Sequence, residues 1–269
     1  MAAVAPLYAQ IQNNGYAPEP VLKQECKLTL FNGLNNAYNE QYFEAEDRFD
    51  EYARCDPSDP IAEWRKSYSW WLRLKAEQTI KAGKKVDAPK VDAKTYTDFM
   101  TLAERGVKKA QAKVAAGDSP DFYRYVIAEL KAVEAIMTFR NDGIGSYFKS
   151  RDLLFEVHRI AEASHYQDAK HLRGMMKYQA SLSFWGRRFL PYDRCGGLGL
   201  IQEAVRGNHG IFSDDIRFVV ANLAMAPARV SEENKFQCGV VWSKTSSDEL
   251  LVRYPHGMFL RRNIIGSAK

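Results

Sequence analysis

The chain has 269 residues, of which 46% are hydrophobic and 12% are aromatic. That share of apolar side chains is enough for a sizeable core and excludes an intrinsically disordered chain. The formal net charge is +5 with 26% charged residues, so acids and bases nearly balance, which argues against a dedicated nucleic-acid-binding protein. No apolar run approaches the roughly 20 residues that cross a bilayer, and we expect no transmembrane segment.

The first 20 residues are predicted to form an irregular N-terminal segment, because Asn, Gly and Pro interrupt any helix there. The opening stretch from Met1 to Gln10 is small and apolar, with no basic residue before Lys23. It is too short for a complete secretory signal but looks like the end of one, with Ala9-Gln10 as the junction. We therefore expect a periplasmic or secreted protein, and a cytoplasmic protein is the alternative.

Two residue pairs predict helix starts, Asp59-Pro60 and Ser119-Pro120. Each places a capping residue before a proline, which is favoured at the first helical position. Apolar residues then recur at spacings of three and four, which puts each set on one helical face. After the first pair they are Ile61, Trp64, Tyr68, Trp71 and Leu72; after the second they are Phe122, Val126, Leu130, Val133 and Met137. We expect these side chains to form core.

Further apolar stripes predict helices over 153–160, 198–205 and 216–223, and the polar stretch 81–94 is predicted to be a linker. No segment shows a sustained strand pattern, and the one rival, 239–242, is too short to outweigh its surroundings. The chain thus predicts an all-α fold of roughly ten or eleven helices with short connections, and consecutive helices should pack antiparallel.

One segment resembles the tetratricopeptide repeat, a family that places glycine, alanine, phenylalanine and proline at fixed offsets in a 34-residue unit. Gly33, Ala45, Phe49 and Pro57 fall at those offsets, and Tyr42 agrees with them. The small Gly33 and Ala45 let two helices approach, Phe49 fills the gap between them, and Pro57 stops the second helix. These residues are the predicted repeat-packing positions.

The resemblance is weaker elsewhere. Thr29, Asn32 and Asn36 replace the large residues expected earlier in the first helix. Looser units follow from 145 onward, with Gly174 as a further repeat-packing residue, and the ending 253–259 resembles that of divergent bacterial tetratricopeptide proteins. The resemblance implies a right-handed α-solenoid of stacked helix hairpins over 21–269, in one domain with a sub-boundary in 81–94.

Such repeat proteins mostly bind or scaffold other proteins, so the resemblance implies binding and not chemistry. We expect a non-catalytic module that binds a protein or peptide in a helical-repeat groove, with no cofactor, no metal and no nucleic acid, and with homo-oligomers allowed. The alternatives are a structural subunit of a bacterial envelope or secreted assembly, and an enzyme whose pocket the sequence does not show.

Two patterns could carry chemistry. His158, His165 and His171 lie close in sequence, with Asp168 between the last two. His165, Asp168 and His171 could stand near one helical face and bind zinc. However, a helix start near Tyr166 puts His165 in a turn and the spacing does not match HExxH, so we interpret the histidines as surface or capping residues. The stretch 195–199, CGGLG, lacks the spacing of a phosphate-binding loop, and we interpret it as a flexible loop at a close helix approach.

The four cysteines, Cys26, Cys55, Cys195 and Cys238, are far apart and form no CxxC pair. The favoured interpretation is four small, partly buried hydrophobic residues. One or two disulfides are the alternative for an exported protein.

The aromatic-rich segment 183–194 is the best candidate for a binding surface. Arginine and aromatic residues are over-represented at the energetic centres of protein interfaces. The predicted partner surface consists of Trp185, Arg187, Arg188, Tyr192 and Arg194. An ordered loop packed on the helices is the alternative.

Overall fold

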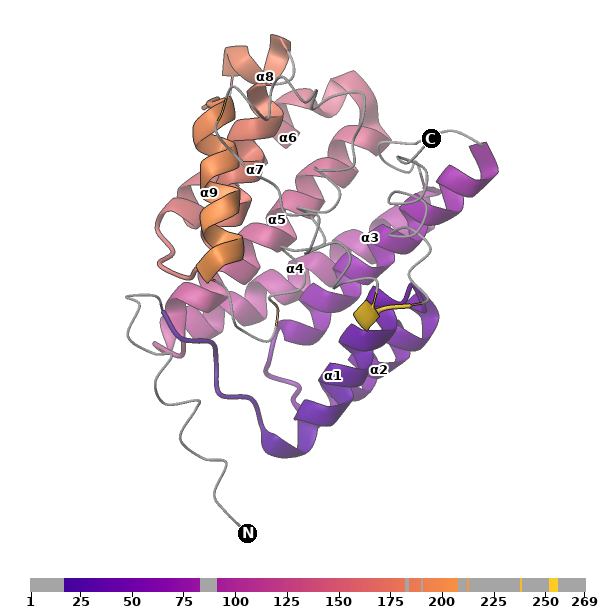
Figure 1. Cartoon of the computed structure of the whole chain (residues 1–269). Coiled ribbons are helices and arrows are strands. Elements are labelled where there is room, and N and C mark those ends of the chain that lie inside the picture. The colour runs from indigo at the N-terminus through magenta and orange to yellow at the C-terminus, as the bar shows by residue number, and fades with distance from the viewer. Residues whose placement is uncertain are drawn as a thin grey trace.

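The computed structural model describes residues 17–82, 91–181, 184–189 and 191–207, together with 212, 238 and 252–255. These residues form nine α-helices and one 3₁₀ turn and contain no β-strand, which confirms the predicted all-α class (Figure 1). Most of the N-terminal segment, the predicted helix at 216–223 and the run 239–242 lie outside the described residues.

The elements follow one another with short connections. In chain order they are α1 (Gln24–Tyr38), α2 (Tyr42–Cys55), α3 (Ile61–Ala82), α4 (Ala93–Ala115), α5 (Pro120–Asp142), the 3₁₀ turn η2 (Gly143–Ser146), α6 (Tyr147–Glu162), α7 (Ala169–Ser181), α8 (Phe184–Phe189) and α9 (Arg194–Gly207). Both helix starts predicted from a capping residue and a proline are confirmed. The predicted linker 81–94 is shorter than expected, because helix replaces it at both ends. Helix α3 continues to Ala82, and α4 already begins at Ala93. Asp92 caps α4 by accepting a hydrogen bond from the Thr95 amide.

Helices that are neighbours in sequence are mostly neighbours in space and pack as antiparallel pairs (Figure 1). The exception is α7, which packs extensively against α9, while the short α8 between them contacts α7. A Cβ atom on Gly174 of α7 would lie 2.5 Å from the carbonyl oxygen of Gly197 in α9. The two backbones therefore touch, which only glycine allows. The predicted loop at 195–199 is instead the first part of α9, although the expected close approach is present.

The core is centred on α3 and α5. The ring of Trp64 makes edge contacts with Phe122 at 6.0 Å and with Tyr125 at 5.7 Å, measured between ring centroids. Phe212, from beyond α9, also reaches this cluster and lies 4.9 Å from Trp64. Trp71 packs instead against a smaller apolar cluster that includes Leu74, Phe99, Val133 and Met137. The second predicted stripe, from Phe122 to Met137, is therefore buried as expected. In the first stripe Ile61 and Trp64 are buried, whereas Tyr68, Trp71 and Leu72 are only half-buried.

All four cysteines form disulfides, Cys26 with Cys55 and Cys195 with Cys238. The favoured sequence interpretation, free hydrophobic cysteines, is therefore wrong. The physical reason is the hairpin: Cys26 lies near the start of α1 and Cys55 ends α2, so antiparallel packing brings their Cα atoms to 5.8 Å. Disulfides persist in oxidising compartments, so the two bonds point to a location outside the cytoplasm. None of the described helices has the length and apolar character needed to cross a membrane.

Candidate functional site

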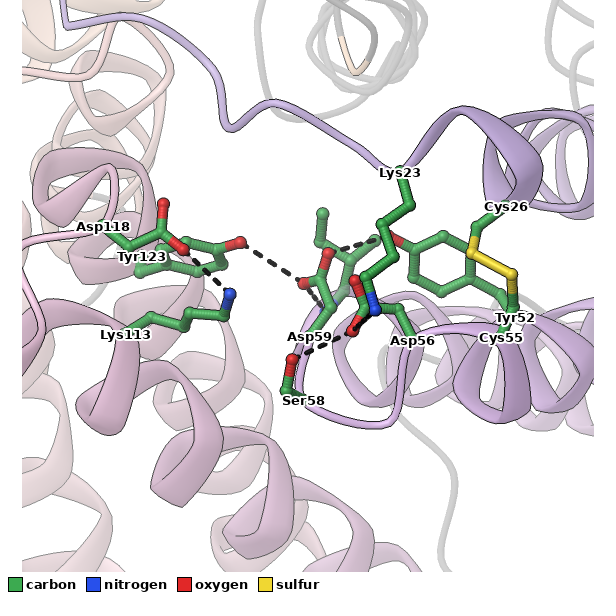
Figure 2. A network of polar contacts seen from close by, with 11 residues as sticks. Lys23, Cys26, Tyr52, Cys55, Asp56, Ser58, Asp59, Lys113, Asp118 and Tyr123 are labelled. Atoms are coloured by element: carbon green, nitrogen blue, oxygen red, sulfur yellow. Dashed lines mark hydrogen bonds and ion pairs between the residues drawn. A yellow bond between two sulfur atoms is a disulfide. The ribbon is translucent and has the colours of Figure 1, made fainter.

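A cluster of buried polar groups lies where the turn between α2 and α3 meets α5 (Figure 2). Its centre is Asp59, which is 4% exposed. The Tyr52 hydroxyl donates to Oδ2 of Asp59 at 2.7 Å, and the Ile61 amide donates to Oδ1 at 3.0 Å. The Tyr123 hydroxyl reaches Oδ1 at 3.5 Å, a long hydrogen bond. One carboxyl group thus connects α2, the start of α3 and the start of α5.

The protonation states follow from burial. Burial raises the pKa of Asp59 and outweighs the hydrogen bonds from Tyr52 and Ile61, which act to lower it. Burial, and secondarily the neighbouring Asp59, also raises the pKa of Tyr52 and of Tyr123. Both tyrosines therefore keep their protons and act as donors. Both carboxyl oxygens of Asp59 already accept hydrogen bonds, so the cluster holds the helices together. We call it the helix joint, and it comprises Tyr52, Asp59 and Tyr123 with the neighbouring ion pairs of Asp56 and Lys113.

The joint continues toward α1 through Asp56, which is 7% exposed. Lys23, at the N-terminus of α1, places its Nζ atom 3.1 Å from Oδ1 of Asp56, and the Ser58 hydroxyl donates to the same oxygen at 2.9 Å. Burial acts to raise the pKa of Asp56, but these hydrogen bonds outweigh it and hold the pKa below its ordinary value. Asp56 is therefore ionised, and its ion pair fixes the start of α1 beside the disulfide Cys26–Cys55 (Figure 2).

On the other side the joint includes α4. Lys113 of α4 forms a 2.8 Å ion pair with Asp118, in the turn before α5. Its Nζ atom also lies 5.8 Å from the ring centroid of Tyr123, within the range of a cation–π contact. Burial acts to lower the pKa of Lys113, but the hydrogen bond and charge of Asp118 outweigh it and raise the pKa. The cluster therefore links the α1–α2 pair to the α4–α5 pair.

A second buried charge holds α4 against α3. Glu63 is 2% exposed, and its Oε1 atom accepts hydrogen bonds from Arg105 at 2.9 Å and from Lys109 at 2.7 Å. A Cβ atom on Gly106 would lie 2.9 Å from the Cβ of Glu63, so the two helices approach closely at this ion pair. Sequence reasoning missed this triad because its members lie 42 and 46 residues apart.

The predicted partner surface is only partly brought together. Arg187 and Arg188 are both exposed on the short helix α8. Tyr192, which follows that helix, is 55% exposed. Trp185 lies in α8, and its side chain is outside the described residues. The segment expected as a loop therefore contains a helix that presents two arginines outward.

Arg194, the fifth residue of that surface, lies at the start of α9 and takes part in the fold. Its Nε atom donates to the hydroxyl of Ser181, at the end of α7, over 3.4 Å. Its charge also acts on Tyr178, whose pKa is raised by burial and lowered in part by Arg194. Arg194 therefore helps to hold α9 on α7.

The predicted repeat-packing residues mostly lie at contacts between helices. A Cβ atom on Gly33 would lie 2.6 Å from Cε1 of Phe49, and both Ala45 and Phe49 are fully buried in α2. Tyr42 is half-buried at the start of α2, and burial raises its pKa. Pro57 is exposed in the turn that follows α2. The close packing of α1 on α2 therefore rests on Gly33, Ala45 and Phe49.

The histidine-rich stretch does not form a metal site within the part of the chain that is described. Helix α7 begins at Ala169, so His165 and Asp168 precede it and share no helical face with His171. His171 and Asp168 are buried, which corrects the expectation of a surface or capping position for His171. His158 lies in α6, where burial lowers its pKa.

Comparison with models of known protein families, with characterised proteins and with solved structures gives no match. The part of the chain that the structure describes is all-helical, and its helices pack mostly in sequential antiparallel pairs.

Proposed function

We propose that this chain is a non-catalytic scaffold that binds a protein or peptide partner in the periplasm or outside the cell. The observation that carries the proposal is the exposed pair Arg187 and Arg188 on α8, followed by the exposed Tyr192. Arginine and tyrosine supply much of the binding energy at protein interfaces, because each combines a large flat surface with hydrogen-bond donors.

The surroundings of this surface support the proposal. Helix α8 packs on α7, and α7 is held by backbone contact with α9 at Gly174 and Gly197. The two arginines are therefore presented on a fixed base, which lowers the entropic cost of binding. The Gly33–Phe49 packing also fits a tetratricopeptide-like stack, and we propose that the helix pairs form such an α-solenoid with its partner groove.

The test is capture of a partner from an extract of the source organism with the purified chain as bait. Replacing Arg187 and Arg188 together by alanine should lower the recovered partner about tenfold or more, as expected for two interface arginines. The matched control replaces Lys94 and Lys108 by alanine, since their side chains on α4 are 86% and 71% exposed and carry the same two charges.

Equal recovery with both double variants would refute the assignment of this surface. The ratio of partner to bait separates the scaffold from the structural-subunit alternative. A substoichiometric client supports a scaffold, whereas a stable polymer of the chain itself supports a structural subunit.

A further inference from the structure

Beyond α9 the chain places one described ring, Phe212, against the core of the helix array. Phe212 follows α9, which ends at Gly207, and it is 1% exposed. Its ring centroid lies 4.9 Å from that of Trp64 on α3 and 5.8 Å from that of Phe122 on α5. The guanidinium carbon of Arg65 lies 5.5 Å from the centroid of the same ring. We call Trp64, Arg65 and Phe122 the Phe212 contact surface.

This surface is suited to an aromatic side chain that comes from outside the helices. Trp64 meets the ring of Phe212 edge-on, at an interplanar angle of 61°, whereas Phe122 stacks on it at 29°. Arg65 adds a cation–π contact with the same ring. Trp64 and Phe122 are 2% and 0% exposed, so departure of Phe212 would uncover parts of two rings that are now buried. Rings uncovered in this way favour contact with another aromatic side chain.

A disulfide closes a loop that contains Phe212. Cys195, at the start of α9, is bonded to Cys238, and the two cysteines are 43 positions apart in sequence. Phe212 lies between them in sequence. A cross-link reduces the number of conformations open to a detached loop much more than it affects the loop in its docked position. The Cys195–Cys238 bond therefore favours the docked position of Phe212.

A reductant can reach this bond, because Cys195 is exposed and Cys238 is half-buried. A thiolate of a dithiol attacks the sulfur of Cys195, and Cys238 leaves as a thiolate that takes up a proton. The second thiol of the dithiol then breaks the mixed disulfide and releases Cys195 as a thiol. Two protein thiols form and the dithiol becomes a disulfide, so electrons and protons balance.

We propose that the Cys195–Cys238 bond is a redox-sensitive staple, which keeps Phe212 on its contact surface until a dithiol of the thiol–disulfide oxidoreductase class reduces it. In the oxidised chain, Phe212 is the occupant of the surface. In the reduced chain, Phe212 detaches more often, and the surface accepts an aromatic side chain of a partner. The surface lies on α3 and α5 and uses no residue of α8, so this inference does not depend on the arginine surface of the proposed function.

The test measures binding of anilinonaphthalene sulfonate, an aromatic fluorescent probe, to the full chain. The main variant combines Cys195→Ser with Cys238→Ser, which removes the staple and keeps Cys26–Cys55. We expect it to bind the probe about tenfold more tightly than the oxidised wild type, because the detached state is no longer restricted. Phe212→Ala should bind the probe tightly even with the staple present, because the occupant is missing. Limiting dithiothreitol should raise binding by the wild type and leave the serine variant unchanged.

Hydrogen–deuterium exchange of the same samples locates the change. Loss of the staple should speed exchange about tenfold in peptides that contain Trp64 or Phe122, since their opening no longer works against the cross-link. Helix α1 provides the internal reference. It keeps Cys26–Cys55, and its Tyr38 packs on Tyr254, which lies beyond the closed loop, so its exchange rate should stay the same.

The matched control for Phe212→Ala is Leu28→Ala, where Leu28 is 70% exposed on α1, and it should leave probe binding unchanged. Far-UV circular dichroism verifies that each variant keeps its helices. Two results would overturn the proposal. One is a serine variant that binds the probe no more tightly than the oxidised wild type. The other is exchange that rises equally in every helix, because the disulfide would then support only the general stability of the fold.

Discussion

The hydroxyl group of Tyr52 and the carboxyl group of Asp59 share a 2.7 Å hydrogen bond that is buried where α2 gives way to α3. The residues are seven positions apart in sequence, so the bond closes the turn between the two helices. The same carboxyl group accepts the Ile61 amide, which α3 would otherwise leave without a partner at its first turn. A single side chain therefore both caps one helix and ties it to the previous one.

Replacing Asp59 by alanine should lower the free energy of unfolding by about 2 kcal/mol or more, because it removes a cap and leaves the buried Tyr52 hydroxyl without an acceptor. Asp59→Asn keeps an acceptor for Ile61 and avoids burying a charge, so its loss should stay below about 1 kcal/mol. Urea denaturation of both variants provides the measurement. If both replacements lowered the free energy of unfolding equally, the stabilisation by Asp59 would come from its charge and not from its capping of the Ile61 amide.

The ion pair of Asp56 with Lys23 should give stability that depends on pH. The pKa of Asp56 is held below its ordinary value of 3.8, so the folded state favours the charged form. That contribution is fully present above pH 3.8 and is lost as pH falls through the lower folded-state pKa. Asp56→Asn should therefore be less stable than wild type at neutral pH, with the difference shrinking toward zero in acid.

Asp59 serves as a control, because its pKa is shifted upward whereas that of Asp56 is shifted downward. The two carboxyl groups should therefore change stability with pH in opposite directions. Burial raises the pKa of Asp59, so any stability it contributes through protonation is present below its ordinary pKa and lost as pH rises through the folded-state value. Relative to wild type, Asp59→Asn should thus gain stability with increasing pH. Thermal melts between acid and neutral pH measure the stability of each variant relative to wild type. If Asp56→Asn and Asp59→Asn changed in the same direction as pH rises, the opposite pKa shifts of the two carboxyl groups would be contradicted.

Local signals predicted the helix starts but not what the caps connect to. Asp59-Pro60 indicated the start of α3, because a cap and a proline act on residues within one turn. The approach of Tyr123 to the same carboxyl spans 64 residues and depends on how α5 packs, which no local pattern contains. Similarly, the repeat resemblance predicts Gly174 as a packing residue, but its partner Gly197 lies in α9, in a stretch whose glycines indicate a loop when taken alone.

The disulfide pairing likewise depends on helix packing, which no local sequence pattern contains. Cys26 and Cys55 are paired because α1 and α2 form one hairpin, and the spacing of the cysteines in the sequence does not contain that packing. Of the predicted partner surface, Arg187 and Arg188 are exposed on α8, and their role in binding stays a prediction. Arg194 lies beside them in sequence but bonds to Ser181, because it starts a separate helix.

The close contact of Gly33 with Phe49 should make that position intolerant of any side chain. A methyl group would lie 2.6 Å from a carbon of the fully buried ring, so Gly33→Ala should cost about 1–3 kcal/mol through overpacking. Ala45→Leu, also fully buried in α2, should cost a similar amount. The control is Gly199→Ala in α9, where a Cβ meets nothing within 4 Å and helix propensity predicts a gain of about 1 kcal/mol. Thermal melts that rank the variants otherwise would contradict the close-packed hairpin.

The two disulfides should differ in how readily a thiol reduces them. Reduction requires a thiolate to reach a sulfur atom, so access controls the rate in the folded protein. Cys26 is fully buried and Cys55 is half-buried in the α1–α2 hairpin, whereas Cys195 is exposed at the start of α9 and Cys238 is half-buried. We therefore expect limiting dithiothreitol to reduce Cys195–Cys238 first, while Cys26–Cys55 survives until the hairpin opens.

Alkylation after timed reduction, followed by peptide mass spectrometry, measures the two bonds separately. In the native protein, label should appear at Cys195 and Cys238 well before it appears at Cys26 and Cys55. In strong denaturant both bonds become accessible, and the two rates should converge, which isolates burial as the cause. Simultaneous reduction in the native protein would mean that the α1–α2 hairpin opens as fast as the reductant attacks, and it would contradict the tight packing around Gly33 and Phe49.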